Sequence, residues 1–150
     1  MFQHILVPVA DDASSQIASR HAQNLSRLLG CRLTFVHVLS DEPLDPVMAR
    51  TSAQSLLERM ANGSRFPPSL RVVTQGERSV PERILEVAHE ENTDLIVMGT
   101  RGGSGIERLA LGSVALGVVD ASEVPVQLIP VREPSGRRFV DRWFRALTRP

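Results

Sequence analysis

The sequence has no lysine, because all seventeen of its basic residues are arginine. This absence excludes a P-loop lysine, Schiff-base catalysis and the anchoring of pyridoxal phosphate. Cysteine is nearly as scarce: Cys31 is the only one, so neither an intrachain disulfide nor a thiolate metal cluster can form. Its place between a glycine and a β-like run predicts a small buried apolar residue.

Long apolar runs are absent as well. No stretch approaches the ~20 residues that span a bilayer, and residues 1–10 are too short and too sparsely basic for a secretory signal. We therefore expect a cytoplasmic protein. The apolar share of 42% and the charged share of 23% are ordinary for a globular chain, and 150 residues suffice for one domain with one hydrophobic core.

Charge is distributed unevenly although the formal total is zero. Residues 1–130 carry 11 arginines against 15 acidic residues, whereas residues 131–150 carry 6 against 2. A mildly acidic body is not typical of a nucleic-acid-binding protein, which needs a basic face for the phosphates, so no nucleic-acid partner is expected. We expect one domain over residues 1–131 and a separate basic tail over residues 132–150.

The tail has the pattern of a basic amphipathic helix. Phe139, Trp143 and Leu147 fall at helical spacing, opposite several arginines. Over residues 137–149 such a helix could lie on an anionic membrane or dock on a protein partner. Alternatively, its apolar face packs on the domain or on a second copy of it.

Strand and helix patterns alternate along the rest of the chain. Short apolar runs predict strands at 5–9, 33–39, 70–74, 94–98 and 124–131. Helical spacing predicts helices at 17–29, 47–60, 81–88 and 113–119, the third of them with Ser79 as N-cap. Five strands alternating with four helices indicate a single open, mostly parallel α/β sheet with helices on both faces. The prolines of the last strand suit an edge position.

A glycine-rich segment follows the fourth strand. Residues 98–105 read Met-Gly-Thr-Arg-Gly-Gly-Ser-Gly, and the next helix begins at the pair Gly112 and Ser113. Glycines let backbone N–H groups approach a ligand closely, and a helix N-terminus favours an anion. The pattern matches neither the Walker A motif nor the dinucleotide fingerprint. From the residues alone, a surface loop and an anion site are equally open interpretations.

The spacing Gly99-x2-Gly102-x9-Gly112-Ser113 resembles the signature of the nucleotide-binding branch of the universal stress protein family. The resemblance covers roughly residues 2–131 and includes, in order, segments 4–9, 35–38, 94–102, 111–114 and 124–126. It implies the strand order 3-2-1-4-5 of the adenine nucleotide alpha-hydrolase-like fold. It also implies a homodimer paired through the last strand, Val124–Val131, and ATP bound across the ends of strands one and four.

The same resemblance assigns the binding residues position by position. Those implied to contact phosphate or ribose are Gly99, Gly102, Gly112, Ser113 and Val114, and those implied to line the adenine side are Pro8, Val9, Val38 and, nearby, Met98. Gly103 belongs to the same glycine loop. Arg101 and Arg108 either reach the phosphates or remain in solvent.

One position departs from the family pattern. Family members commonly carry an aspartate two residues after the strand-one proline, where this chain has Ala10 followed by Asp11 and Asp12. Either a neighbouring aspartate makes that contact with the nucleotide, or the contact is missing. Asp11 or Asp12 could also hold Mg²⁺ beside a triphosphate, or supply N-terminal charge to the first helix.

The expected function is that of an ATP-binding regulatory module of the stress response that acts as a homodimer. The sequence offers no dedicated general base or nucleophile, so any ATP hydrolysis should be slow. Its four histidines lack metal-type spacing, and His21 and His37 are interpreted as core or rim residues. A slow ATPase and a nucleotide-free dimeric interaction protein are the alternatives.

Overall fold

The computed structural model of the chain describes residues 1–41, 43–100 and 112–131. Arg101, Gly102, Gly103 and the basic tail 132–150 therefore lie outside the described residues. The strands are β1 (His4–Pro8), β2 (Arg32–Leu39), β3 (Ser69–Thr74), β4 (Leu95–Thr100) and β5 (Val126–Pro130). The helices are α1 (Ala13–Leu29), α2 (Pro46–Ala61), α3 (Val80–Glu90) and α4 (Ser113–Ala121).

All five strands pair in parallel, in the order β3-β2-β1-β4-β5. This confirms the expected sheet and its order. β5 lies at an edge, as its prolines predicted, although it begins at Val126 and not at Val124. The strand order reverses between β1 and β4, and in sheets of this kind such a reversal opens a crevice beyond the carboxyl ends of the strands.

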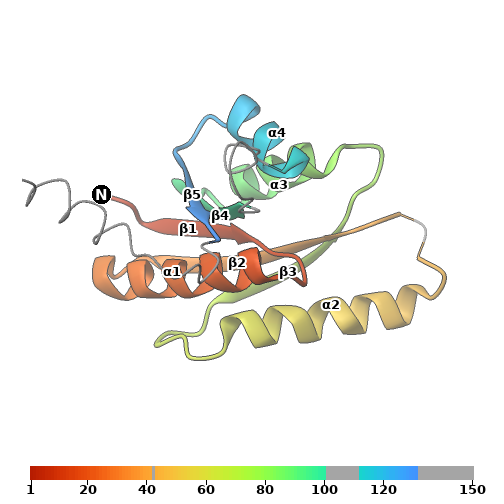
Figure 1. Cartoon of the computed structure of the whole chain (residues 1–150), viewed down its shortest axis with the longest axis horizontal. Coiled ribbons are helices and arrows are strands. Elements are labelled where there is room, and N and C mark those ends of the chain that lie inside the picture. The colour runs from red at the N-terminus through yellow and green to blue at the C-terminus, as the bar shows by residue number, and fades with distance from the viewer. Residues whose placement is uncertain (42, 101–111, 132–150) are drawn as a thin grey trace, which may run out of the picture.

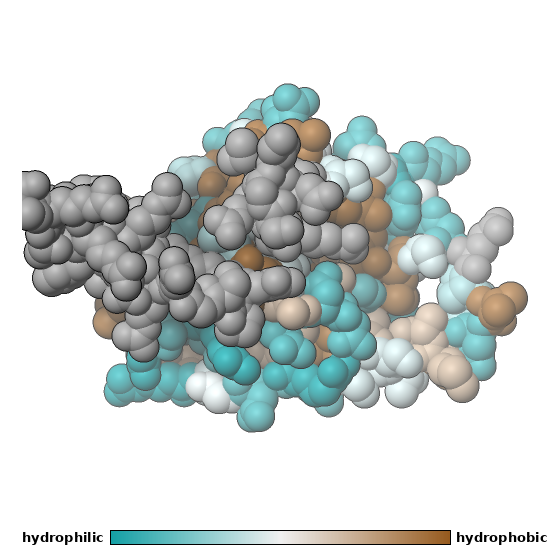
Figure 2. All heavy atoms as spheres, in the orientation of Figure 1, coloured by the Kyte–Doolittle hydropathy of each residue, from teal (hydrophilic) through white to brown (hydrophobic). Residues whose placement is uncertain are grey.

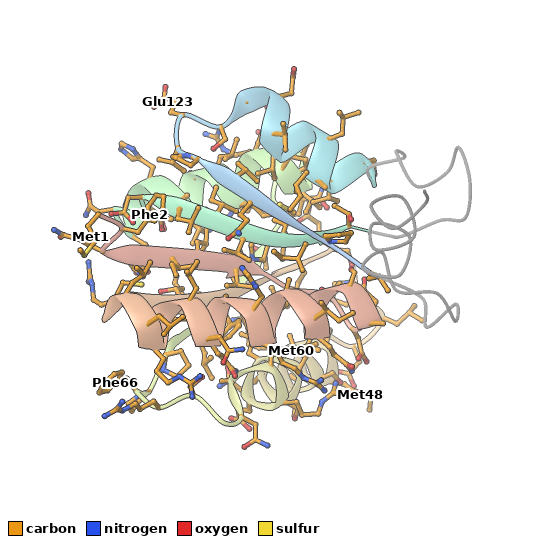
Figure 3. All side chains as sticks on the ribbon, turned by 60° about the vertical axis from the view of Figure 1, so that its left-hand side comes forward. Met1, Phe2, Met48, Met60, Phe66 and Glu123 are labelled. Atoms are coloured by element: carbon orange, nitrogen blue, oxygen red, sulfur yellow. The ribbon has the colours of Figure 1, made fainter. Side chains whose placement is uncertain are left out.

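Helices cover both faces of the sheet: α1 and α2 lie on one side, and α3 and α4 on the other (Figure 1). Side chains of alternate residues in each strand point to opposite faces of the sheet. Ile5, Val7 and Phe35 belong to the core under α1 and α2, whereas Leu6 and Val36 belong to the core under α3 and α4. Strands buried on both faces explain why the sequence shows continuous apolar runs there. Side chains occupy both interlayer spaces (Figure 3).

Helix boundaries follow local chemistry that is readable in the sequence. The side chain of Asp12 accepts a hydrogen bond from the backbone N–H of Ser15 and begins α1, which ends at Gly30 with φ of 66°. Ser79 and Glu82 form a reciprocal capping box at the start of α3. These bonds hold the pKa of the Glu82 carboxyl below its ordinary value.

At the amino-terminal edge of the sheet, His4 is a buried and fully bonded histidine. Its Nδ1 donates to the Glu91 carbonyl (2.9 Å), since a carbonyl can only accept, and its Nε2 is hydrogen-bonded to the Thr34 hydroxyl (2.8 Å). Cys31 is buried as expected, and burial raises the pKa of its thiol. Both residues are thereby interpreted as structural.

The outer surfaces of α1 and α2 are largely hydrophilic (Figure 2). Leu44 and Met48, where the chain enters α2, are apolar side chains that remain exposed. None of the helices in the described part of the chain is long and apolar enough to cross a membrane.

Candidate nucleotide site

A cavity of about 260 Å³ lies at the carboxyl ends of β1 and β4, where the strand order reverses. Nine of the residues expected at the binding site line it: Pro8, Val9, Ala10, Val38, Met98, Gly99, Gly112, Ser113 and Val114. These come from three strand ends and from the start of α4, so residues distant in sequence meet at one edge of the sheet. Asp11 does not line the cavity.

The start of α4 forms one side of this cavity. The described helices α1, α2 and α3 each begin with a side-chain cap, supplied by Asp12, Asp45 and Ser79. In contrast, α4 begins at Gly112 without any side-chain cap, and its first helical bond runs from Leu116 to the Gly112 carbonyl. Among the described residues, no side chain caps the first turn of α4, and Gly112, Ser113 and Val114 of this turn line the cavity.

The glycines at the two ends of the loop differ in their surroundings. A Cβ on Gly99 would overlap the Ser14 carbonyl oxygen and lie 2.5 Å from its carbonyl carbon. Gly99 therefore lets the first turn of α1 pack against β4. A Cβ on Gly112 would meet no atom of the described residues within 4 Å, so their packing does not demand glycine there. Gly99 has a structural role that its place in a binding motif did not reveal.

The loop between β1 and α1 is held by a network of short bonds. The N–H of Ala10 donates to the Ser15 hydroxyl (2.8 Å), and Asp12 accepts from the Ser14 hydroxyl (2.7 Å) and the Ser15 N–H (2.8 Å). Asp12 thus caps α1, in accord with the interpretation that it supplies negative charge to the start of this helix. Asp12 also lines the cavity. Asp11 lies 3.5 Å from Arg59, and both side chains are mostly exposed.

The ladder between β1 and β2 stops short of the cavity. Arg32 N–H donates to Gln3 O and Val36 O accepts from Val9 N–H, so the even-numbered residues of β2 direct their backbone groups at β1. The next rung would join Val38 N–H to Val9 O, but among the described residues no backbone bond does so. The Val9 carbonyl accepts instead from His37 Nδ1 at 2.7 Å.

His37 was expected to be a core or rim histidine, and it is half-buried at the cavity wall. Its contact with Val9 joins residues 28 positions apart in the sequence, so no local pattern could predict it. Other wall residues that the sequence did not suggest are Ser14, Ser15, Val36, Val80, Ile84 and Ala115. Four of these are apolar and extend the wall beside Val38 and Met98.

A second hollow, of about 300 Å³, lies between α1 and α2. Gln16, Arg20, Gln23 and Arg59 are among its wall residues, and none of the residues expected at the binding site is. It lies away from the strand reversal, so the cavity at β1 and β4 is the better candidate for the nucleotide. Within the described ranges, no group of three or more histidine, cysteine or acidic side chains is arranged to hold a metal ion.

A doubly wound parallel sheet with an apolar cavity and an uncapped helix start at its reversal point defines a small α/β domain suited to an anionic organic ligand. The chain matches the model of the universal stress protein family over residues 1–130. It belongs to that family.

Individual relatives agree with this assignment. A universal stress protein of Methanocaldococcus jannaschii is 26% identical over 140 residues, which cover 86% of this chain and 82% of the relative. The structure of a universal stress protein from Archaeoglobus fulgidus superposes with a TM-score of 0.73 at 24% identity, covering 86% of this chain and 99% of the other. The fold is therefore shared along most of both chains.

Two further structures of the family contain nucleotides. One is the universal stress protein from Archaeoglobus fulgidus in complex with dAMP, with a TM-score of 0.68, 21% identity and coverage of 85% and 97%. The other is a universal stress protein in complex with cAMP, with a TM-score of 0.67, 19% identity and coverage of 85% and 97%. At these identities the likeness shows the fold alone.

Proposed function

We propose that this protein binds ATP in the cavity at the ends of β1 and β4 and acts in the cytoplasm as a nucleotide-dependent regulatory homodimer. The observation that carries the proposal is the uncapped start of α4, which opens onto the cavity at Gly112. The dAMP and cAMP complexes of structural relatives support an adenine nucleotide as the ligand class.

The phosphate end of the site follows from the geometry of α4. The first-turn N–H groups of α4, which no side chain of the described residues caps, and the partial positive charge of a helix N-terminus favour an anion, and Ser113 adds a hydroxyl. Such a cradle requires no lysine, which suits a chain that has none. Arg101, Gly102 and Gly103 would complete the cradle and remain a prediction from the resemblance.

The base end of the site is apolar with one polar strip. Val38, Met98, Val80 and Ile84 form walls that suit the faces of a purine. The N–H and C=O of Val38 point toward β1 beyond the last rung of the ladder, so a donor and an acceptor lie side by side. Adenine presents a complementary acceptor and donor on one edge.

We propose Mg²⁺ only as an ion that binds together with the triphosphate of ATP. Asp12 is the one acidic residue among the described residues of the cavity wall, and its carboxylate is engaged in the cap of α1. Asp11 is turned toward Arg59. Neither residue offsets the loss of a carboxylate at Ala10, so we expect ATP affinity to rest on the helix start and the base pocket.

Substitution of Gly112 by aspartate tests the proposal. An aspartate at this N-cap should cap α4 and slightly stabilise the fold, by roughly 0.3 kcal/mol. Its charge should repel the triphosphate by about 2 kcal/mol and weaken ATP binding roughly thirtyfold. Isothermal titration with ATP measures the affinity, and thermal melting measures the stability.

Gly112→Asn is the matched control, because asparagine caps the helix without the charge. We expect Gly112→Asn to bind ATP much more tightly than Gly112→Asp. Absence of binding heat from the unmodified protein at millimolar ATP, or equal ATP affinity of the two variants, would contradict the proposed site.

The homodimer is proposed through the open edge of β5. Pro125 O and Val131 N–H are hydrogen-bonded to β4, so the backbone groups of the odd-numbered residues of β5 face β4. Val126 and Leu128 therefore direct their N–H groups away from the sheet. Leu128→Pro should remove an outward donor while leaving the β4 ladder in place. In sedimentation velocity we expect the unmodified protein to have twice the mass of the chain and the variant to shift toward monomer. A monomeric unmodified protein would refute the dimer.

A further inference from the structure

We propose that His37 is a positioning residue for the base of the nucleotide: by holding the Val9 carbonyl, it ends the β1–β2 ladder early and keeps the Val38 N–H open to the site. This inference rests on the proposed nucleotide binding. It concerns a side chain that lies at the cavity wall but was interpreted from the sequence as a core or rim residue.

The protonation of His37 follows from its partner. A backbone carbonyl can only accept, so Nδ1 carries the hydrogen in the 2.7 Å bond to Val9 O. The acceptor is itself well fixed, because Val9 is buried and its own N–H is bonded to Val36 O at 2.9 Å. The imidazole therefore gives Val9 O the hydrogen bond that the next backbone donor of β2, the Val38 N–H, would otherwise give it.

The chain leaves the sheet directly after this contact. Ala10 N–H turns to the Ser15 hydroxyl, so residues 9 and 10 are tied to two different elements, β2 through His37 and α1 through Ser15. The Val9 carbonyl, which would be the next ladder acceptor for the Val38 N–H, is thus already bonded to His37. The opening beside Val38 is produced by side chains and does not follow from the strand lengths alone.

A purely structural histidine would behave differently from a positioning one. Loss of a structural bond would lower stability and weaken all ligands of the cavity together. Loss of the positioning bond should allow Val38 N–H to close the rung with Val9 O. It should then affect only ligands that have a base, because the phosphate cradle at α4 is on another element.

The experiment compares His37→Phe, which keeps an aromatic ring without the donor, with His37→Asn, whose amide nitrogen can replace Nδ1. His37→Leu serves as a second variant without a donor in case His37→Phe does not fold. Hydrogen exchange of the Val38 amide is measured on the ligand-free proteins. ATP and inorganic tripolyphosphate are then titrated into each of them.

In His37→Phe we expect exchange at Val38 to slow about tenfold as the rung closes, and ATP to bind about tenfold more weakly. Tripolyphosphate affinity should not change, and His37→Asn should resemble the unmodified protein in all three measurements. Unchanged Val38 exchange in both variants that lack the donor, or equal weakening of ATP and tripolyphosphate, would overturn the inference. If the unmodified protein binds neither ligand, the proposed function fails, and the Val38 exchange still decides the role of His37 in the ladder.

Discussion

Gly99→Ala should lower the free energy of unfolding by about 3 kcal/mol, the largest effect we expect from a single methyl group in this chain. The added Cβ would overlap the carbonyl oxygen of Ser14, and that atom belongs to helix backbone, which cannot rotate away as a side chain can. Relief requires α1 to shift from β4, so the loss should involve packing along the helix. Urea denaturation measures the change, and the melting temperature should fall by about 8 °C.

Gly112→Ala is the control for this prediction. The same methyl group at Gly112 meets no atom of the described residues within 4 Å, and we expect a loss of only about 0.5 kcal/mol, because alanine is a poorer N-cap than glycine. The two glycines belong to one sequence motif, yet one should govern folding and the other should not. If the Gly99→Ala protein were as stable as Gly112→Ala, the start of α1 could move away from β4 without a loss of stability, and the prediction would be wrong.

Asp94→Ala should destabilise the protein by about 3 kcal/mol at neutral pH. The Asp94 carboxylate accepts from the backbone N–H groups of Gln3 (2.8 Å) and His4 (3.0 Å), and so holds the start of β1 against β4. Alanine would leave both donors without this partner. Asp94→Asn keeps one acceptor and should lose about half as much, as measured by urea denaturation.

The contribution of Asp94 should depend on pH. Partial burial alone would raise the pKa of its carboxyl, but the bonds from His4 and Gln3 hold that pKa below the ordinary 3.8. The folded protein therefore binds the proton less readily than the unfolded chain. The stabilisation is complete above about pH 4 and is lost as the pH falls through the lowered value.

Asp11→Asn is the matched control for the pH experiment, because the Asp11 side chain is 70% exposed and its ion pair with Arg59 is a surface pair. Its stability should stay near that of the unmodified protein. In Asp94→Asn the acid loss of stability should be smaller than in the unmodified protein. If Asp94→Asn and the unmodified protein lost equal stability as the pH falls, Asp94 would not have this role.

Much of the fold could be predicted because its signals are local. Runs such as 5–9 and 94–98 are apolar throughout, which is typical of parallel strands buried on both faces, and the structure has β1 and β4 there. Ser79 and Gly30 act at helix ends as their chemistry predicts. The strand order came from the family resemblance, since no local pattern encodes which strands become neighbours.

The candidate site was predictable only in part. The glycine spacing identified Gly112 and Ser113, and the cavity brings them together with Pro8, Val38 and Met98. The roles of Asp94 and His37 were missed because each depends on a bond to a residue far away in sequence, 90 and 28 positions for His4 and Val9. Nothing in the neighbouring residues distinguishes them from other polar side chains.

By itself the sequence determined the class of fold, the presence and approximate extent of the four helices, the burial of Cys31 and the presence of a glycine segment before a helix. Each of these depends on residue type and on spacing within one or two turns. Only the tertiary structure decided that Gly99 serves packing against Ser14 while Gly112 leaves a helix start open. The reason is physical: a glycine's role depends on which atoms would meet its missing side chain, and those atoms come from elsewhere in the chain.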